Sequence, residues 1–421
     1  MAGTLVLFTA SFPFRNYTEE VFLMPELEAL RHEFDRIIIV PLERRGEPVK
    51  LAYPNIETDT FIADHLYSRA KVLKSPYLLH PSVAKHYKHL ARESKSIKGF
   101  LSGVFFCMNS RCFGSLIDRW ITGKGLDLKS TLFYTFWFDH ITSALALVSD
   151  LRPMKIVTRA HGHDVYDSQI QFRSHMFREY TLDRLCKVFP ASDNASGYLK
   201  SHYPAQSPKI LTRILGSVKI HGERTATAHD EDENRWTFFS CARVSQEKRV
   251  DRCFGLVKAI ATAYPLKHIC WIHVGDGNLM PSLKKSIATT ELPPNLTIDL
   301  RGAVENESVQ GIYISEKIDW CMLLSDSEGG CPITLCEALS YGVPVVATEV
   351  GGIPEIVTPE VGITVPAGTS PEAVVGELQP YLNNRQFYLE LKSECRKRWQ
   401  SMFCASTLRQ DFARELSEMI S

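Results

Sequence analysis

The sequence predicts an α/β protein made of two doubly wound parallel sheets. Apolar runs of strand length alternate with amphipathic stretches of helix length along almost the whole chain, which is the pattern of a parallel sheet covered on both faces. The pattern breaks once, at residues 217–235, which are polar, charged and without periodicity. The chain has 421 residues, enough for two or three domains. One interruption in one repeating pattern therefore predicts two Rossmann-like halves joined by a linker.

The elements follow from this alternation in chain order. In the first half, strands are expected at residues 5–8, 36–40, 132–136, 155–158 and 187–190, with helices at 19–31, 139–148 and 172–185. In the second half, strands are expected at 236–241, 269–274, 296–301, 319–324 and 343–348, with helices starting at 248, 308 and 332. Residues 383–421 are expected to form two helices that carry apolar contact residues at intervals. The predicted division is an N-terminal domain over 1–216, a linker over 217–235, a C-terminal domain over 236–382, and C-terminal helices over 383–421 that can pack back on the N-terminal domain.

Composition excludes several classes of protein. The 48 Lys and Arg balance the 48 Asp and Glu, whereas a dedicated nucleic-acid binder is normally basic, so no nucleic-acid partner is expected. The sequence contains no uncharged apolar stretch of about 20 residues, so no transmembrane helix is predicted. The apolar residues 5–14 follow no Lys or Arg, and we interpret them as a buried first strand rather than a secretory signal. The 11 cysteines form no C-x-x-C pair, which favours reduced thiols and a cytosolic protein.

Basic residues gather in one part of the first half. Residues 65–129 hold 12 Lys and Arg against 3 Asp and Glu, interleaved with aromatic and aliphatic residues. One interpretation is an ordinary solvated helical face with its core residues. The other is a surface for an anionic membrane or a phosphate-bearing substrate. The second interpretation requires several of the lysines to share one face, and these lysines are Lys71, Lys74, Lys85, Lys88, Lys95 and Lys98.

The most informative stretch is residues 325–357, SDSEGGCPITLCEALSYGVPVVATEVGGIPEIV. A strand ending near residue 324 is followed by an acidic loop, by Gly329 and Gly330, and by a helix that opens at Pro332. The glycines let the backbone approach a ligand, and the free N–H groups of a helix start suit a phosphate. Glu328 before the helix and Glu337 within it can then address one ligand whose anionic part lies on the helix end.

These residues resemble the donor site of retaining glycosyltransferases of the GT-B fold, of the family-4 type found in polysaccharide and glycolipid synthesis. That family has an E-G-x-x-x-x-x-x-E-A segment followed by G-x-P-V-x-A/T and G-G-x-x-E, and the segments EA, GVPVVA and GGIPE match it here. This segment departs from the family in one respect, because eight residues rather than seven separate Glu328 from Glu337. Glu328 can fill the position of the first acid only if the loop after it absorbs the extra residue.

Other segments agree with the family in sequence order. SCARVSQEKRVD resembles its G-R-L-x-x-x-K-G stretch, with Ala242 in place of the usual glycine and Arg243 and Lys248 at its two cations. VGDGNL resembles its strand-end turn at Gly275, and LRGAVENESV its hinge segment at Gly302. In the first half, SFPFRNYTEEVFLMPELEAL resembles the family's opening, and KIVTRAHGHDVY resembles its R-x-H-G-x-D-x-Y loop.

The resemblance implies a role for each matched residue. Arg243 and Lys248 would bind the diphosphate, Glu328 the donor-sugar hydroxyls, and His161 a sugar or acceptor hydroxyl; these four are the expected catalytic residues. Glu337 would hold the ribose hydroxyls. The remaining expected substrate-binding residues are Gly329, Gly330, Cys331, Pro332, Ile333, Asp164, Gly275 and Gly302. No acidic or His cluster has metal-ligand spacing, so no metal and no cofactor are expected.

The expected activity is transfer of a sugar, with retention of configuration, from a UDP- or GDP-linked donor to a saccharide or lipid-linked acceptor. The expected location is the cytoplasm, at the inner face of the membrane, with peripheral contact to anionic lipid. Two alternatives stay open. One is a sugar-nucleotide epimerase of the same fold, and the other is a non-catalytic subunit that binds nucleotide sugars, because the spacing after Glu328 and the residue before Arg243 depart from the family pattern.

Overall fold

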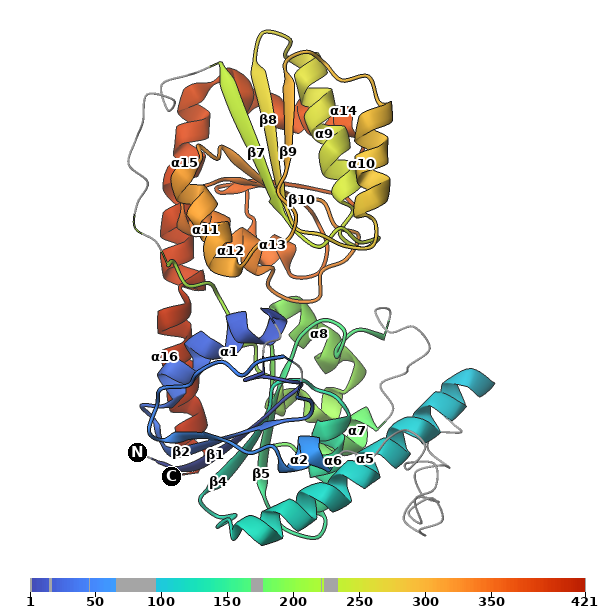
Figure 1. Ribbon diagram of the computed structural model, residues 1–421, viewed down its shortest axis with the longest axis vertical. Helices are drawn as coiled ribbons and strands as arrows, with labels where there is room; N and C mark the ends of the chain where they lie inside the picture. Colours follow the sequence, from blue (N-terminus) through green and yellow to red (C-terminus); the bar gives the residue numbers. More distant parts are fainter. Residues whose placement is uncertain are drawn as a thin grey trace. The chain divides into compact units, whose positions relative to one another are not determined.

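In the computed structural model the chain forms two units, each with its own parallel sheet (Figure 1). The structure describes residues 2–14, 17–44, 46–65, 96–167, 177–220, 222 and 234–420. The first unit comprises Met1–Ile214 together with Ser406–Ser421, and the second comprises Leu215–Ala405. The prediction of two doubly wound α/β halves is confirmed.

The first unit is built on six parallel strands in the order β3-β2-β1-β4-β5-β6. Their bounds are β1 Ala2–Thr9, β2 Phe34–Pro41, β3 Ile56–Thr58, β4 Thr131–Thr135, β5 Lys155–Ala160 and β6 Lys187–Pro190. Because both faces of such a sheet are covered, its central strands are continuous apolar runs rather than alternating ones. β1 shows this in Leu5–Phe8, all of it buried. The strand order reverses between β1 and β4, and loops that carry ligands gather at such a point.

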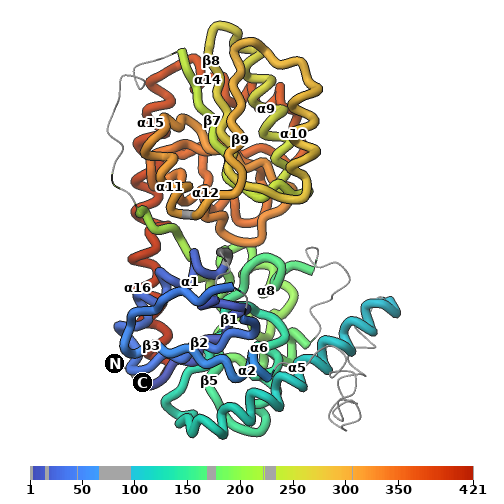
Figure 2. Tube along the Cα trace, viewed as in Figure 1, coloured from blue at the N-terminus to red at the C-terminus, as the bar shows by residue number. Residues whose placement is uncertain are grey.

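Helices cover both faces of the first sheet. The described helices are α1 Tyr17–Leu30, α2 Phe61–Asp64, α5 Ile97–Lys124, α6 His140–Ser149, α7 Arg178–Arg184, α8 Asp193–His202, a 3₁₀ turn at Pro204–Lys209, and α16 Ala405–Glu418. On one face, α5 and α6 pack through residues such as Trp120 and Leu145. On the other, α16 lies beside α1, and Phe412 and Leu416 share a core with Leu23 (Figure 2). The last residues of the chain therefore complete the core of the first unit.

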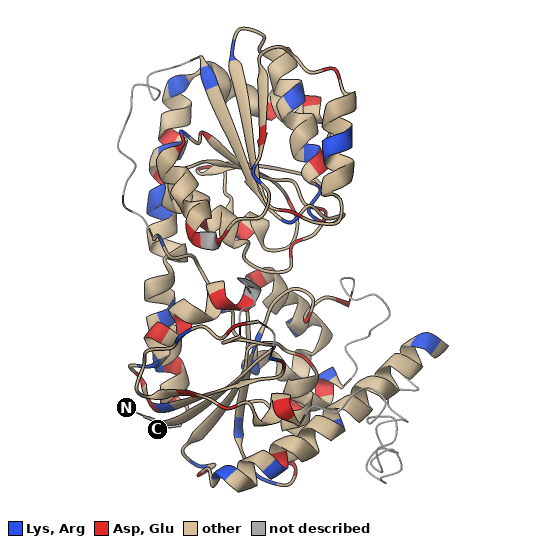
Figure 3. Cartoon of the chain, viewed as in Figure 1, with Lys and Arg blue, Asp and Glu red and all other residues tan. Residues whose placement is uncertain are grey.

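The helix α5 is long and was not predicted as a single element. Within the described part of the chain it is the one helix long and apolar enough to cross a membrane, by length and composition. Half of its most apolar window is buried inside the protein, as is usual for a core helix. Charged residues of both signs are scattered over the helices of both units (Figure 3). Of the six lysines singled out above, only Lys98 lies within the described residues.

The second unit repeats the architecture, with strands in the order β12-β11-β10-β7-β8-β9, all parallel. The strands are β7 Arg235–Cys241, β8 His268–Val274, β9 Leu296–Leu300, β10 Trp320–Leu323, β11 Val345–Thr348 and β12 Gly362–Val365. The helices are α9 Val250–Ala263, α10 Met280–Thr289, α11 Asn306–Ser315, α12 Ile333–Ser340, α13 Ile353–Ile356, α14 Pro371–Asn383 and α15 Arg385–Arg398. The strand order here reverses between β7 and β10, so the loops following these two strands are the expected ligand loops.

The segment predicted as a linker begins inside the second unit. Ser217 donates its backbone N–H to the carbonyl of Phe403 at 3.0 Å, and its hydroxyl accepts a hydrogen bond from the Trp399 indole, also at 3.0 Å. Ile220 donates its backbone N–H to the side chain of Gln310 at 2.9 Å. Residues 221 and 223–233 lie outside the described residues.

Candidate active site

The two loops at the strand reversal of the second unit are tied to each other. The loop after β7 carries Arg243 and Lys248, and the loop after β10 carries Glu328. The backbone N–H of Asp326 donates to the carbonyl of Glu247 at 2.7 Å, which joins the loops directly. Two arginines at the start of α9 reinforce this junction, because Arg249 and Arg252 both form ion pairs with Asp326. The side chains predicted for the donor site thus converge at one edge of one sheet.

Lys248 and Glu328 form the centre of this arrangement. The Lys248 ammonium donates to both carboxylate oxygens of Glu328, each at 2.7 Å. The hydroxyl of Ser325 donates to the same carboxylate at 2.7 Å, and the Glu328 side chain is only 7% exposed. The loop therefore brings the carboxylate of Glu328 to the lysine despite the extra residue that separates it from Glu337.

Arg243 differs from its neighbouring cations in being available to a ligand. Its side chain is 70% exposed, and its ion pair with Glu247 is long, at 3.4 Å. Arg249, by contrast, is held between Asp251 and Asp326, and these carboxylates raise the pKa of its guanidinium. A diphosphate could engage Arg243 without breaking a close internal pair, whereas Arg249 would have to give up two.

Gly275 lets the turn after β8 lie directly against the end of β7. Its φ of +135° belongs to the region that favours glycine, and a Cβ there would lie 2.0 Å from the carbonyl oxygen of Ala242. Its backbone N–H donates to the carbonyl of Gly302 at 2.8 Å, so the turns after β8 and β9 are joined as well. Gly275 therefore positions the loop that carries Arg243 through a close backbone approach, and Gly302 holds the turn at Gly275.

The segment from Gly329 to Pro332 leads into α12, and its residues are partly exposed. The helix begins at Ile333, one residue later than predicted, with Pro332 as the N-cap and no side-chain cap. The first N–H groups of a helix have no acceptor within it, so those of α12 are available to an anion. Gly351 fixes the other side of this loop, because at its φ of +56° a Cβ would lie 1.6 Å from the carbonyl oxygen of Glu328.

Glu337 is buried in α12 and is held by a residue that sequence reasoning missed. Gln310 of α11 donates from Nε2 to Glu337 at 3.2 Å and to the carbonyl of Val218 at 2.8 Å. Its Oε1 accepts hydrogen bonds from the Tyr341 hydroxyl and from the backbone N–H of Ile220, each at 2.9 Å. The amide of Gln310 thus fixes the direction of the Glu337 carboxylate. No sequence signal pointed to Gln310, because its partners come from two distant segments, residues 218–220 and α12 with its C-cap.

In the first unit, the Asp164 side chain connects two loops. Its two carboxylate oxygens accept the backbone N–H of His161 at 2.6 Å and that of Phe138 at 2.9 Å, and its side chain is buried. It therefore joins the loop after β5 to the loop after β4.

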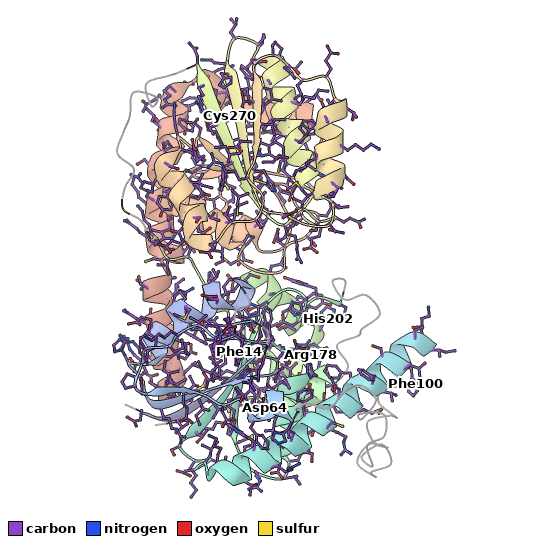
Figure 4. All side chains as sticks on the ribbon, viewed as in Figure 1. Phe14, Asp64, Phe100, Arg178, His202 and Cys270 are labelled. Carbon is purple, nitrogen blue, oxygen red and sulfur yellow. The ribbon has the colours of Figure 1, made fainter. Side chains whose placement is uncertain are left out.

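Arg178, labelled in Figure 4, is a buried cation in the same unit. Its guanidinium carbon lies 3.7 Å from the centroid of the Phe138 ring, and burial lowers the pKa of the guanidinium.

His161 is enclosed by aromatic rings and bonded through one ring nitrogen. Its Nε2 lies 3.0 Å from the carbonyl oxygen of Phe136, which requires that nitrogen to carry the proton. Burial lowers the pKa of His161, so the neutral imidazole is favoured and its Nδ1 remains an acceptor. The rings of Phe136 and Trp137 lie 4.7 and 4.5 Å from the imidazole, centroid to centroid.

Glu19 is the second residue that sequence reasoning did not single out. Its buried carboxylate accepts the backbone N–H groups of Ala10, Ser11 and Phe12 at 2.7, 2.8 and 2.9 Å. It also accepts the indole N–H of Trp137 at 2.6 Å. Glu19 therefore holds the loop after β1 and orients the tryptophan that packs on His161. It stands inside the segment that resembles the family's opening, which was the only signal that could have identified it.

Among the described residues, no three or more His, Cys, Asp or Glu side chains are grouped so that they could hold a metal ion.

Comparison with known proteins finds similarity to glycosyltransferases. Residues 223–399 match the model of the glycosyl transferases group 1 family. The chain is 23% identical over 306 residues to an uncharacterized glycosyltransferase of Methanocaldococcus jannaschii, covering 72% of this chain and 79% of that one. It is 26% identical over 238 residues to the amylovoran biosynthesis glycosyltransferase AmsK of Erwinia amylovora, where the match spans 52% of this chain and about half, 54%, of the relative.

Solved structures share the fold over the full length. Sucrose-phosphate synthase of Thermosynechococcus elongatus superposes with a TM-score of 0.67 at 16% identity, covering 99% of this chain and 98% of that one. Anabaena HepE, solved in complex with UDP, gives 0.61 at 16% identity, covering 99% of each chain. TarM of S. aureus gives 0.65 at 11% identity, covering 99% of this chain and 100% of that one. Residues 223–399 are thus similar to the glycosyl transferases group 1 model, and the chain has the two-domain architecture of GT-B glycosyltransferases.

Proposed function

We propose that this protein transfers a sugar from a nucleotide-diphosphate donor to a hydroxyl of a saccharide or lipid-linked acceptor, with retention of the anomeric configuration. The observation that carries the proposal is the pairing of Lys248 with Glu328 beside the exposed Arg243, at the strand reversal of a glycosyltransferase group 1 domain. Cations for a leaving diphosphate and a carboxylate for sugar hydroxyls then meet within one pair of loops.

The donor would be bound in three parts. Glu337, directed by Gln310, accepts the ribose hydroxyls. Arg243, Lys248 and the first N–H groups of α12 bind the diphosphate. Glu328 accepts hydroxyls of the sugar, and Lys248 then shares its three N–H groups between that carboxylate and the phosphate.

The chemical step loads negative charge onto the leaving diphosphate. Fixed cations that are already in place stabilise that charge without reorganisation, which is the largest single contribution in many enzymes. With Arg243 and Lys248 in this role, the reaction would need no divalent metal and no enzyme nucleophile. The acceptor hydroxyl would attack from the face that the phosphate leaves, which preserves the configuration. His161 would accept a hydrogen bond from a sugar or acceptor hydroxyl through Nδ1.

A uridine donor is the first to test, because HepE was solved with UDP and with UDP-glucose. A guanosine donor is the second. An acceptor used in polysaccharide synthesis is supported by the similarity to an amylovoran biosynthesis glycosyltransferase. For such an acceptor we propose a cytoplasmic enzyme that binds an anionic membrane peripherally through the basic residues of 65–129, most of which lie outside the described residues.

A nucleotide-sugar panel tests the proposal. Thermal shift identifies the base and sugar that bind, and a donor-hydrolysis assay with and without EDTA measures turnover. We expect one nucleotide sugar to be consumed at a rate that EDTA does not change. Interconversion of the donor sugar without transfer would indicate an epimerase instead, and binding without turnover would indicate a non-catalytic subunit. Co-sedimentation with anionic vesicles at low and high salt tests the membrane contact separately, and absence of binding at low salt would remove it.

A further inference from the structure

Two thiols meet inside the loop that leads into α12. The Sγ atoms of Cys331 and Cys336 lie 3.3 Å apart, and both cysteines are free thiols. Cys331 is partly exposed and lies before the helix, whereas Cys336 is fully buried within it. An accessible thiol is thus in contact with a protected one, five residues further along the chain.

The pair can close with a small movement of one partner. A disulfide needs a sulfur–sulfur distance of about 2.05 Å, so the gap has to shorten by roughly 1.3 Å. Cys336 is fixed by the packing of α12. Cys331 can move because it lies outside the helix and follows Gly329 and Gly330, which have no side chains to hinder backbone rotation.

We propose that Cys331 and Cys336 are a reversible oxidation site that closes to an intrachain disulfide in the presence of a hydroperoxide. In the first step the sulfur of Cys331 attacks one peroxide oxygen, the O–O bond breaks, and a sulfenic acid and water form when the peroxide is H₂O₂. In the second step the sulfur of Cys336 attacks the sulfenic sulfur, and the hydroxyl leaves as a second water molecule. Two thiols lose two electrons and two protons in total, and one peroxide is reduced to two waters.

The order of the two steps follows from burial. Burial raises the pKa of Cys336 well above its ordinary value, and the neighbouring Cys331 raises it further. A buried thiol of this kind is a poor first nucleophile toward a solvent oxidant. Cys331 meets the oxidant first, and Cys336 then attacks an activated sulfur that it already touches.

The position of the pair connects oxidation to the donor site, a link that rests on the proposed function. Cys331 lies between Glu328 and Glu337, in the segment that approaches the diphosphate. A disulfide would draw the backbone at Gly330 to Pro332 toward the interior of α12 and take it out of the geometry that the reduced loop presents. We therefore expect oxidation to weaken donor binding, and bound donor to shield Cys331 from the oxidant.

Mass spectrometry tests the disulfide without any assay of transfer. The full-length protein is treated with dilute H₂O₂, denatured, alkylated and digested, and the thiols of the two cysteines are followed with and without dithiothreitol. We expect both to escape alkylation after oxidation and to recover it after reduction. Cys331→Ser should abolish the protection of Cys336, and Cys336→Ala should leave Cys331 in a reactive singly oxidised form. Cys186→Ser, an exposed thiol of the first unit, is the matched control and should change nothing at the pair.

Alkylation of Cys336 in the fully peroxide-treated protein would overturn the proposal. The link to the donor site is read by UDP affinity, which we expect to fall about tenfold on oxidation and to return on reduction, a size typical of coupled sites. Unchanged affinity in protein shown by mass to be oxidised would overturn that link. Failure of the proposed function would appear differently, as absence of UDP binding or turnover in the reduced protein, and would leave the disulfide result intact.

Discussion

Lys248 holds both carboxylate oxygens of Glu328 at 2.7 Å across the two loops that meet at the strand reversal of the second sheet. This ion pair is partly shielded from water, since the lysine side chain is 23% exposed and the glutamate 7%. The residue expected to bind phosphate and the residue expected to bind sugar are therefore preorganised by each other before any donor arrives.

Breaking this pair should cost both stability and activity. Lys248→Ala leaves a nearly buried carboxylate without its cation, and we expect a loss of about 3 kcal/mol in the free energy of unfolding. Glu328→Gln should lower the free energy of unfolding by less, because the buried amide carries no charge that needs a partner. In the double variant, Lys248→Ala with Glu328→Gln, the two losses of stability should not add, because both charges are removed and no unpaired charge is left in the site. Urea unfolding of the four proteins measures this, and strictly additive effects would mean that the pair carries no coupling energy.

Arg243 should behave in the opposite way. Because its side chain is 70% exposed, Arg243→Ala should leave the free energy of unfolding within about 0.5 kcal/mol of the wild type. Loss of a fixed cation at the leaving group should lower turnover by about 100-fold or more. Lys285→Ala, an exposed cation on α10, is the control and should leave turnover unchanged. Near-normal turnover of Arg243→Ala would remove this residue from the proposed mechanism.

Gln310 should act on donor binding through Glu337. Gln310→Ala removes the amide that directs the carboxylate, and we expect the affinity for UDP to fall about tenfold with a smaller effect on kcat. Gln310→Glu keeps the shape but places a second carboxylate beside Glu337, so UDP binding should improve as the pH falls and the pair takes up a proton. Calorimetry between about pH 5.5 and 8 measures both effects. Gln386→Ala on α15 is the control, and a loss equal to that of Gln310→Ala would show that the effect is nonspecific.

His273 makes stability depend on pH in the second unit. Burial lowers the pKa of this histidine to about 4, and its Nδ1 lies 2.9 Å from the Ser240 hydroxyl. The unfolded chain binds a proton near pH 6.5, whereas the folded protein resists it, so the contribution is complete above that pH and is lost as the pH falls toward 4. At pH 5 the loss should be about 2 kcal/mol. Unfolding curves at pH 7 and 5 test this, with the slope reduced in His273→Phe and unchanged in His268→Gln, an exposed histidine on the same strand.

Gly351 should be intolerant of any side chain. In Gly351→Ala the added Cβ would meet the carbonyl oxygen of Glu328 at 1.6 Å, so the acidic loop has to move and turnover should fall along with stability. Gly376→Ala offers the matched control, because nothing lies within 4 Å of a Cβ there and the site is inside α14. That substitution should stabilise the protein by up to about 1 kcal/mol. Equal effects of the two substitutions in thermal unfolding would contradict the close approach at Gly351.

The alternation of apolar strands with amphipathic helices was enough to predict both sheets, because parallel strands buried on two faces leave a strong local pattern. Short elements at the sheet edge left no such pattern, and β3, with three partly exposed or exposed residues, was missed. The long α5 was missed for another reason. Its apolar residues contribute to three separate apolar clusters on different sides of the helix. The apolar residues therefore repeat only weakly with the 3.6-residue period of a helix.

The sequence pointed to the candidate site where the site residues lie close together in the chain, as they do from Glu328 to Glu337. The site was not predictable where a side chain acts through distant partners. Gln310 contacts segments at Val218, Glu337 and Tyr341, and only folding brings these together. Asp164 was predicted as a substrate contact, and the structure adds a second role that the sequence did not indicate, because its two oxygens accept backbone N–H groups from two different loops.

The return of α16 to the first unit has a consequence for the order in which the chain can fold. Phe412 and Leu416 fill one face of the first sheet, but they follow the whole second unit in the chain. During synthesis that face stays uncovered while the second unit is made, and its apolar strands are exposed to aggregation over that time. The N-terminal 214 residues expressed alone would keep this open face permanently. The rate of synthesis, rather than the stability of the finished protein, then determines when the first unit can complete its core.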